Sequence, residues 1–327
     1  MRRLHGISAA FQSAKVFATV TARNTEHRLI QSALYSTRNS SSSMSHIFSN
    51  NKHDDQSYRP SANVVSGTVL FSVAASTLAK EAHAKEPIPP NFRPNDVVLY
   101  QYEACPFCNK VKAFLDYYDI PYKIVEVNPL SKKEIKWSDY KKVPILMVDG
   151  TQMVDSSDII DKLSQKVRPN IGNKSTSNND EENKWRKWVD NHLVHILSPN
   201  IYRSASEALE SFDYITTQGN FSFYERTVAK YAGAAAMYFV SKNLKKKYNI
   251  TDERASLYEA AETWVDALNG RDFLGGSKPN LADLAVFGVL RPIRYLKSGK
   301  DMVENTRIGS WYSRMESAVG QPSKVQA

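Results

Sequence analysis

Residues 96–164 alternate between the two-residue hydrophobic period of strands and the 3.6-residue period of helices. The apolar run at 97–100 predicts a buried strand over 96–102. Four apolar residues then follow at i, i+3, i+4 and i+7, the spacing of one helix face: Val111, Phe114, Leu115 and Tyr118. Pro106 suits the first turn of this helix, where its missing N–H is not needed. A strand therefore leads directly into a helix.

The same two periods continue for four strands and three helices. The remaining predicted elements are a strand at 122–127, a helix at 131–137, strands at 143–148 and 151–154 with a turn at 149–150, and a helix opened by 155–158. This order resembles the thioredoxin fold, in which a Val-Pro pair precedes the third strand and has a cis peptide bond. Pro144 occupies that position.

Beyond residue 164 the chain first becomes polar and then reads as helical throughout. Tryptophans mark two amphipathic stripes: Trp185, Trp188, Val189, His192, Leu193 and Ile196, then Leu257, Ala260, Ala261, Trp264, Val265 and Leu268. We interpret the tryptophans, His192 and His195 as core packing or, for the histidines, as satisfied helix residues. Residues 221–240 predict a long buried helix, and Lys242 to Lys247 a solvated helix end. Asn280 and Asp283 have the spacing of a capping box.

These patterns divide the chain into a thioredoxin/glutaredoxin-like domain, a linker and a helical domain. The fold class is α/β plus all-α, a thioredoxin-like domain followed by a helical domain of the glutathione-transferase C-terminal type. The predicted bounds are 96–168 for the first domain, 169–181 for the linker, 182–320 for the helical domain and 321–327 for a tail.

The only two cysteines, Cys105 and Cys108, lie where the first strand meets the first helix. Unpaired N–H groups and the positive dipole end at a helix start favour a thiolate, so Cys105 is the candidate nucleophile. A structural zinc site lacks a second cysteine pair, and no histidine follows within sixty residues. A disulfide closing so small a loop would constrain little. Two buried unreactive thiols are the remaining alternative.

CPFC resembles the glutaredoxin-type CPYC, and several longer segments resemble the membrane-associated prostaglandin E synthase 2 family. The resemblance runs from about Val97 to Ser317 and recurs in both domains. Its segments are 100–102, 109–116, 125–129, 140–146, 197–203, 207–209, 211–214 and 278–291.

The resemblance implies a dimeric, glutathione-binding protein that isomerises prostaglandin H2 to prostaglandin E2 and also binds haem together with glutathione. Cys105 matches the catalytic thiol, and Tyr102 and Phe107 match residues that line its pocket. The glutathione contacts match Phe107, Val143, Pro144, Asp155 and Ser156. We therefore expect the Cys105 sulfur to be exposed at the mouth of a cleft that runs to Pro144 and Ser156, beside an aromatic rim.

Two other function classes stay open on the residues alone. In a glutaredoxin-like oxidoreductase, Cys105 attacks a glutathione mixed disulfide and Cys108 resolves it. A non-catalytic module would bind glutathione or haem without turnover. The Asp155–Ser156 pair is itself compatible with an ordinary helix N-cap.

Charge is concentrated at the N-terminus. Of the formal charge of +9, residues 1–95 contribute eleven Lys and Arg against five Asp and Glu. The folded part is thus only mildly basic, which argues against a nucleic-acid partner. Two cysteines in a redox-type spacing fit a reducing compartment.

The N-terminal region predicts targeting and membrane attachment. Residues 1–45 contain six Lys and Arg, with Glu26 as the only acid, and resemble a mitochondrial presequence cut near 34–36. Residues 61–79 carry no charge but are diluted by Ser, Thr and Gly, so they are a candidate membrane anchor. The Pro-rich stretch up to residue 95 would then be a tether, completing an anchor-and-tether region at 46–95.

Overall fold

The computed structural model describes residue 89 and residues 92–129, 131–168, 176–218, 227 and 229–325. The predicted presequence at 1–45 and the predicted anchor at 61–79 lie outside these residues. Among the helices that are described, none combines the length and apolar character that crossing a bilayer requires.

A four-stranded sheet forms in the order β2-β1-β3-β4. β1 (Val97–Gln101) pairs in parallel with β2 (Lys123–Glu126) and antiparallel with β3 (Ile145–Val148), and β3 pairs antiparallel with β4 (Thr151–Val154). Asp149 and Gly150 close the β3–β4 hairpin with φ of 47° and 79°. The positions of all four predicted strands are confirmed.

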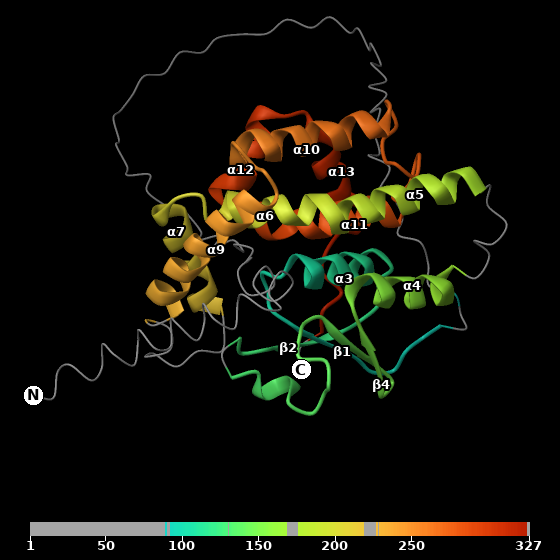
Figure 1. The fold of residues 1–327 in the computed structure, drawn as a ribbon. Helices are drawn as coiled ribbons and strands as arrows, with labels where there is room; N and C mark the ends of the chain where they lie inside the picture. Colours follow the sequence, from blue (N-terminus) through green and yellow to red (C-terminus); the bar gives the residue numbers. More distant parts are fainter. Residues whose placement is uncertain are drawn as a thin grey trace, which may run out of the picture. The chain divides into compact units, whose positions relative to one another are not determined.

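Two helices cover one face of this sheet, α3 (Pro106–Tyr117) and α4 (Ser156–Val167) (Figure 1). α3 lies between the sheet and α11 (Leu281–Leu290) of the helical region. The approach of α11 to α3 is so close that a Cβ at Gly288 would lie 2.5 Å from the Lys110 Cα. Glycine at this position therefore lets the two domains pack backbone against backbone.

The predicted helix at 131–137 is wrong. Only the 3-10 turn η1 (Lys133–Ile135) forms, and Lys132 before it has a left-handed φ of 49°. A segment this short gains few backbone hydrogen bonds for the residues that it orders, so local contacts decide its shape. Here the Trp137 indole N–H donates to the Glu134 carbonyl at 2.7 Å.

The helical region contains more helices and turns than the two tryptophan stripes predicted. In chain order they are α5 (Thr176–Trp188), the π turn η3 (Val189–Leu193), α6 (Val194–Ile201), α7 (Ala205–Gln218), the π turn η4 (Ala229–Gly233), α9 (Ala234–Lys247), α10 (Glu253–Leu268), α11, the 3-10 turn η5 (Arg291–Ile293), α12 (Lys297–Asn305) and α13 (Ile308–Val319).

Three features of the helical region differ from the predictions. α5 begins at Thr176, inside the predicted linker 169–181, because contacts with α11 stabilise a helix that its polar sequence does not favour. The helix predicted at 221–240 falls partly on residues outside the described ranges, and its described part is not buried throughout: Tyr231 and Phe239 are exposed. α9 does run on to Lys247, as the predicted solvated helix end required. His192 is exposed rather than in the core, because the π turn inserts a residue and rotates the stripe.

The C-terminal segment, predicted as a tail, returns to the first domain. Asp116 of α3 is completely buried, and its carboxylate accepts hydrogen bonds from the Tyr122 hydroxyl at 2.9 Å, the Ser323 amide at 3.0 Å and the Arg291 guanidinium at 2.8 Å. Lys324 forms a parallel bridge with Tyr122. One buried carboxylate thus joins α3, the end of α11 and the C-terminal segment.

Truncation after Gly320 is expected to lower the free energy of unfolding by about 2 kcal/mol, because it removes the Ser323 amide from buried Asp116 and the backbone bridge at Tyr122. Urea unfolding followed by circular dichroism measures this. Ser323→Ala, which loses only the exposed hydroxyl bond to Asp119, is the control and should change stability by less than about 0.5 kcal/mol. An unchanged urea midpoint in the truncated chain would show that the segment is not structural.

Candidate functional site

Three segments predicted to carry function meet at one edge of the sheet. Tyr100 pairs with Ile145, and Ile145 pairs with Val154. The end of β1, the start of β3 and the end of β4 are therefore neighbours. This register brings together Cys105 after β1, Val143–Pro144 before β3, and Asp155–Ser156 after β4. The Val143–Pro144 peptide is cis, as predicted.

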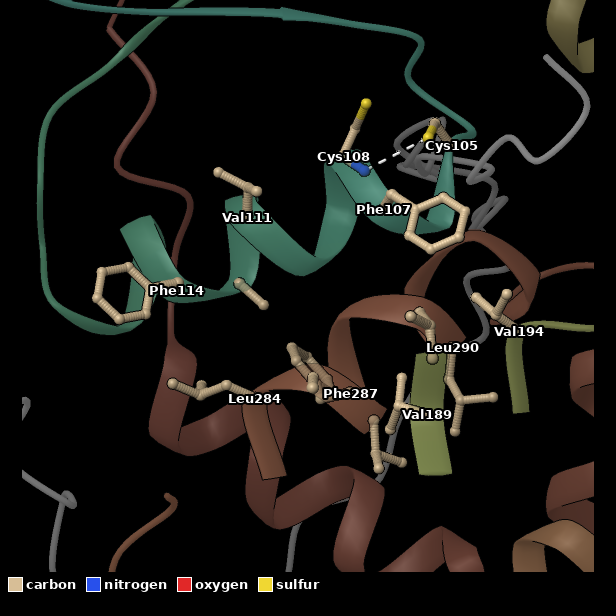
Figure 2. Packing of buried hydrophobic residues seen from close by; sticks show 14 of the residues in the cluster. Cys105, Phe107, Cys108, Val111, Phe114, Val189, Val194, Leu284, Phe287 and Leu290 are labelled. Atoms are coloured by element: carbon tan, nitrogen blue, oxygen red, sulfur yellow. Dashed lines mark hydrogen bonds between the residues drawn. The ribbon is translucent and has the colours of Figure 1, made fainter. Parts of the chain in front are cut away.

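Cys105 is the N-cap of α3, and Pro106 follows at the first helical position. The Cys108 amide donates to the Cys105 Sγ at 3.4 Å, a contact that stabilises negative charge on this sulfur (Figure 2). The buried Asn109 side chain holds the loop in place by donating to the Glu103 carbonyl at 2.7 Å and to the Cys105 carbonyl at 3.1 Å. The sulfur is thus positioned by the helix that it caps.

The expected exposure of the sulfur is wrong. Cys105 and Cys108 both have an exposed fraction of 0%, and both are free thiols. Tyr102 and Phe107 are buried too, so the expected aromatic rim is not open in this structure. Figure 2 shows Phe107 on the side of α3 that faces Leu290 and Val194. The sequence patterns treat the domains separately, whereas packing of the helical domain on α3 covers this ring.

Cys108 differs from Cys105 in its electrostatic environment. Burial raises the pKa of the Cys108 thiol well above its usual range, and the hydrogen bond and charge of Cys105 act in the same direction. Cys108 is therefore a neutral thiol at physiological pH.

We expect alkylation to distinguish the two thiols. Iodoacetamide should react with Cys108 in a Cys105→Ser variant at least about 10-fold more slowly than with Cys105 in a Cys108→Ser variant at pH 7.5. Because burial remains after Cys105 is replaced, the rate for Cys108 should still be rising above pH 9, as deprotonation exposes more thiolate. Mass spectrometry of time points measures both rates. Equal rates, or a plateau below pH 8, would contradict this assignment.

Two tyrosines lie within the electrostatic range of the cysteine pair. Burial raises the pKa of Tyr102, and the charges of Cys105 and Cys108 add to the effect. Burial also raises the pKa of half-buried Tyr140 to about 12, with further contributions from Asp155, Cys105 and Cys108. Both phenols are consequently protonated at neutral pH and can donate hydrogen bonds.

The start of α4 still has hydrogen-bonding groups that could hold a ligand after its N-cap hydrogen bonds are formed. The Asp155 carboxylate is the N-cap and accepts from the amides of Ser157 and Asp158 at 3.0 and 3.3 Å. Ser156 is buried, and its hydroxyl and amide have no hydrogen-bond partner among the described residues. Helix N-termini attract anions, so this serine is suited to a carboxylate ligand.

Three further residues at the site had no role assigned from the sequence: Asn109, Lys110 and Tyr140. Asn109 could have been suspected, because an amide side chain in the first turn of a helix often returns to the preceding loop. Lys110 bonds to Asp190, which is 80 positions away, so no local signal could reveal the pair. Tyr140 is brought to the site by the turn that precedes the cis peptide.

The comparison with family models agrees with the architecture of the first domain. The family model described as "Glutathione S-transferase, N-terminal domain" matches residues 99–170. Among solved structures, a β-etherase from Sphingobium sp. strain SYK-6 is 18% identical, with a TM-score of 0.46, and the match covers 69% of this chain and 96% of that one.

Two curated relatives are much more similar in sequence. "Prostaglandin E synthase 2" of Danio rerio is 47% identical over 266 residues, which is 68% of this chain and 71% of the relative. The protein of the same name from Mus musculus is 42% identical over 277 residues, 70% of this chain and 72% of the relative. Identity at this level over two thirds of the chain shows that the chain belongs to the prostaglandin E synthase 2 family.

Proposed function

We propose that this protein is a glutathione-binding isomerase that converts prostaglandin H2 to prostaglandin E2 through the Cys105 thiol. The proposal rests on one observation. Three segments meet at one edge of the sheet, in a chain that is 47% identical to a prostaglandin E synthase 2. These segments are the Cys105 helix cap, the Val143–Pro144 peptide and the start of α4.

Glutathione fits the groups present at this edge. An extended tripeptide can pair with the backbone at Val143, and its γ-glutamyl carboxylate can accept from the free amide and hydroxyl of Ser156. Bound in this way beside α3, it would supply a second thiol near Cys105. Because Cys105 is buried, binding of glutathione and of the endoperoxide requires local opening around the sulfur.

The chemistry balances as an isomerisation. The Cys105 thiolate attacks one endoperoxide oxygen, which forms an S–O bond and breaks the O–O bond, and the released oxygen takes a proton. Removal of the hydrogen on the carbon that bears the sulfur-bound oxygen then forms the carbonyl, breaks the S–O bond and restores the thiolate. No external oxidant or reductant is consumed.

Tyr102 is the proposed proton carrier for both steps. Its phenol is neutral at physiological pH because burial raises its pKa, so it can protonate the released oxygen. The phenolate that results is a strong base and can remove the ring hydrogen in the second step. The phenol is thereby regenerated with the thiolate.

The raised pKa of Cys108 favours this function over a dithiol oxidoreductase. Resolving a mixed disulfide requires a thiolate at the second cysteine, and burial of Cys108 disfavours that form. The isomerase needs only Cys105.

One assay set separates the candidate functions. Purified full-length protein is mixed with prostaglandin H2, with and without glutathione, and separately with a glutathione mixed disulfide. Formation of prostaglandin E2 that depends on Cys105 and not on Cys108 supports the isomerase. Turnover of the mixed disulfide alone identifies an oxidoreductase, and ligand uptake without turnover identifies a binding module.

Haem enters the proposal only together with glutathione. Within the described part of the chain, no group of three or more His, Cys, Asp and Glu side chains is arranged to hold a metal. Haem would be held at the glutathione site, with the glutathione thiol as the group that binds the iron. A haem absorbance shift that needs glutathione supports this, and one that does not need it argues against it.

The proposal also includes a homodimer attached to a mitochondrial membrane. It rests on the family, the presequence-like composition of residues 1–45 and the uncharged stretch 61–79. Carbonate extraction of organelles tests the attachment by comparing the full chain with a variant that lacks 61–79. Sedimentation of the purified protein tests the dimer.

A further inference from the structure

A buried lysine connects the site to the helical domain. Lys110 lies on α3, two residues after Cys108, and only 3% of its side chain is exposed. Its ammonium donates to Asp190 Oδ1 at 2.6 Å and to the Ser157 hydroxyl oxygen at 2.8 Å. The Ser157 hydroxyl in turn donates to Asp190 Oδ2 at 2.7 Å. These three residues form a closed triad across α3, α4 and η3.

The π turn explains how Asp190 reaches this position. η3 interrupts the helix that runs from α5 to α6, and Asp190 is its second residue. π turns inside α-helices are rare and are frequently found at functional sites. The turn exposes His192 and brings Asp190 to Lys110 and Ser157. The helical domain thus contributes a charged residue to the first turn of α4.

The triad residue on α4, Ser157, lies next to the proposed glutathione contact. Ser157 directly follows Ser156, a buried residue whose hydroxyl makes no hydrogen bond to the described residues and is available to a ligand. The Ser157 amide is used by the Asp155 cap at 3.0 Å, so the hydroxyl bond to Asp190 is additional to ordinary capping. Its effect is to hold the N-terminal turn of α4 at a set distance from α3, which carries Cys105.

We propose that Lys110, Ser157 and Asp190 form a positioning triad that holds the start of α4 at a fixed distance from Cys105. Glutathione binding then depends on a contact from the helical domain. This inference rests on the proposed function for the identity of the ligand. None of the three residues needs to touch the reacting atoms.

Ser157→Ala tests the triad with the smallest disturbance, because it removes one hydroxyl and leaves the Lys110–Asp190 ion pair intact. We expect the dissociation constant for glutathione, measured by calorimetry on the full chain, to rise by roughly 5- to 50-fold. The KM for glutathione should rise by a similar factor, with kcat at saturating glutathione unchanged. Ser157→Thr restores the hydroxyl and should bind within about twofold of the wild type.

Lys110→Met is the second variant. It should fold, because Asp190 is 31% exposed and can be solvated when its partner is removed. It should weaken glutathione binding at least as much as Ser157→Ala. Lys245→Met is the matched control, because the same substitution breaks a partly buried ion pair with Glu253 between α9 and α10, in the helical domain. Its binding constant should be unchanged.

Hydrogen exchange gives a readout that does not depend on the ligand. In Ser157→Ala the amides of residues 157–159 should exchange about 10-fold faster, while those of the α4 end stay as in the wild type. Unchanged exchange together with unchanged binding would overturn the triad while leaving the proposed function intact. If the wild type itself binds no glutathione, the proposed function fails, and the inference fails with it.

Discussion

Replacing Cys105 with serine is expected to slow the conversion of prostaglandin H2 to prostaglandin E2 by at least about 1,000-fold. A serine hydroxyl is not ionised at neutral pH and is a much weaker nucleophile than a thiolate, so the attack on the endoperoxide oxygen is lost. The measurement is product formation by mass spectrometry, corrected for the spontaneous breakdown of the substrate.

Cys105→Ser should leave the fold of the protein unchanged. Cys105 is the N-cap of α3, and serine is among the preferred residues at that position. The helix and the Asn109 contacts to the loop should persist, and circular dichroism with thermal unfolding checks this. Cys108→Ser is the matched control, at the other buried thiol of the motif, and should keep conversion within about threefold of the wild type.

Wild-type activity in the Cys105→Ser variant would overturn the proposed function. If Cys105→Ser converted the endoperoxide at the wild-type rate, the thiol would have no chemical role. If both variants were inactive with the endoperoxide and the wild type reduced a mixed disulfide, the dithiol function would replace the isomerase.

Asp283→Ala is expected to lower the free energy of unfolding by about 4 kcal/mol, the largest stability effect predicted here. Its carboxylate accepts from the amides of Leu274, Gly275 and Asn280 and from the Trp311 indole, at 3.0, 3.1, 3.0 and 3.1 Å. Asp283 is fully buried, and alanine would leave these donors without a partner. Urea unfolding of the purified chain measures the loss.

Asp252→Ala provides the comparison for this prediction. Asp252 is also a helix cap, at α10, but it is exposed. Its side chain accepts from the Ala255 amide, at 2.8 Å, with a smaller contribution from the Arg254 amide. Loss of the Asp252 carboxylate should lower the free energy of unfolding by about 1 kcal/mol. If the two variants were equally destabilised, Asp283 would be acting only as a cap, and the bonds to Leu274 and Trp311 would contribute nothing.

Features set by neighbouring residues could be predicted from the sequence. The strand that became β1, the N-cap at Asp155 and the capping box of Asn280 and Asp283 all formed as predicted. Each depends on backbone propensity or on side chains within three or four positions. The cis peptide at Val143–Pro144 was predicted from the resemblance to a known fold.

Weak local signals were overridden by packing. The segment 131–137 lacked the length to form a helix alone, and the polar start of α5 became helical through contact with α11. The π turn at Val189–Leu193 broke a regular tryptophan stripe and exposed His192. Periodicity within one helix cannot reveal such a turn, because its benefit lies in partners on other elements.

The sequence by itself determined the two domain types, the helix-capping cysteine, the serine beside Asp155 and, through its similarity to known relatives, the family. Only the tertiary structure decided that the Cys105 sulfur is buried and that Lys110 meets Asp190. It also decided that Asp116 meets Arg291, 175 positions away. The physical reason is that burial and ion pairing depend on which surfaces the fold brings together, and those surfaces come from segments that have no neighbours in common along the chain.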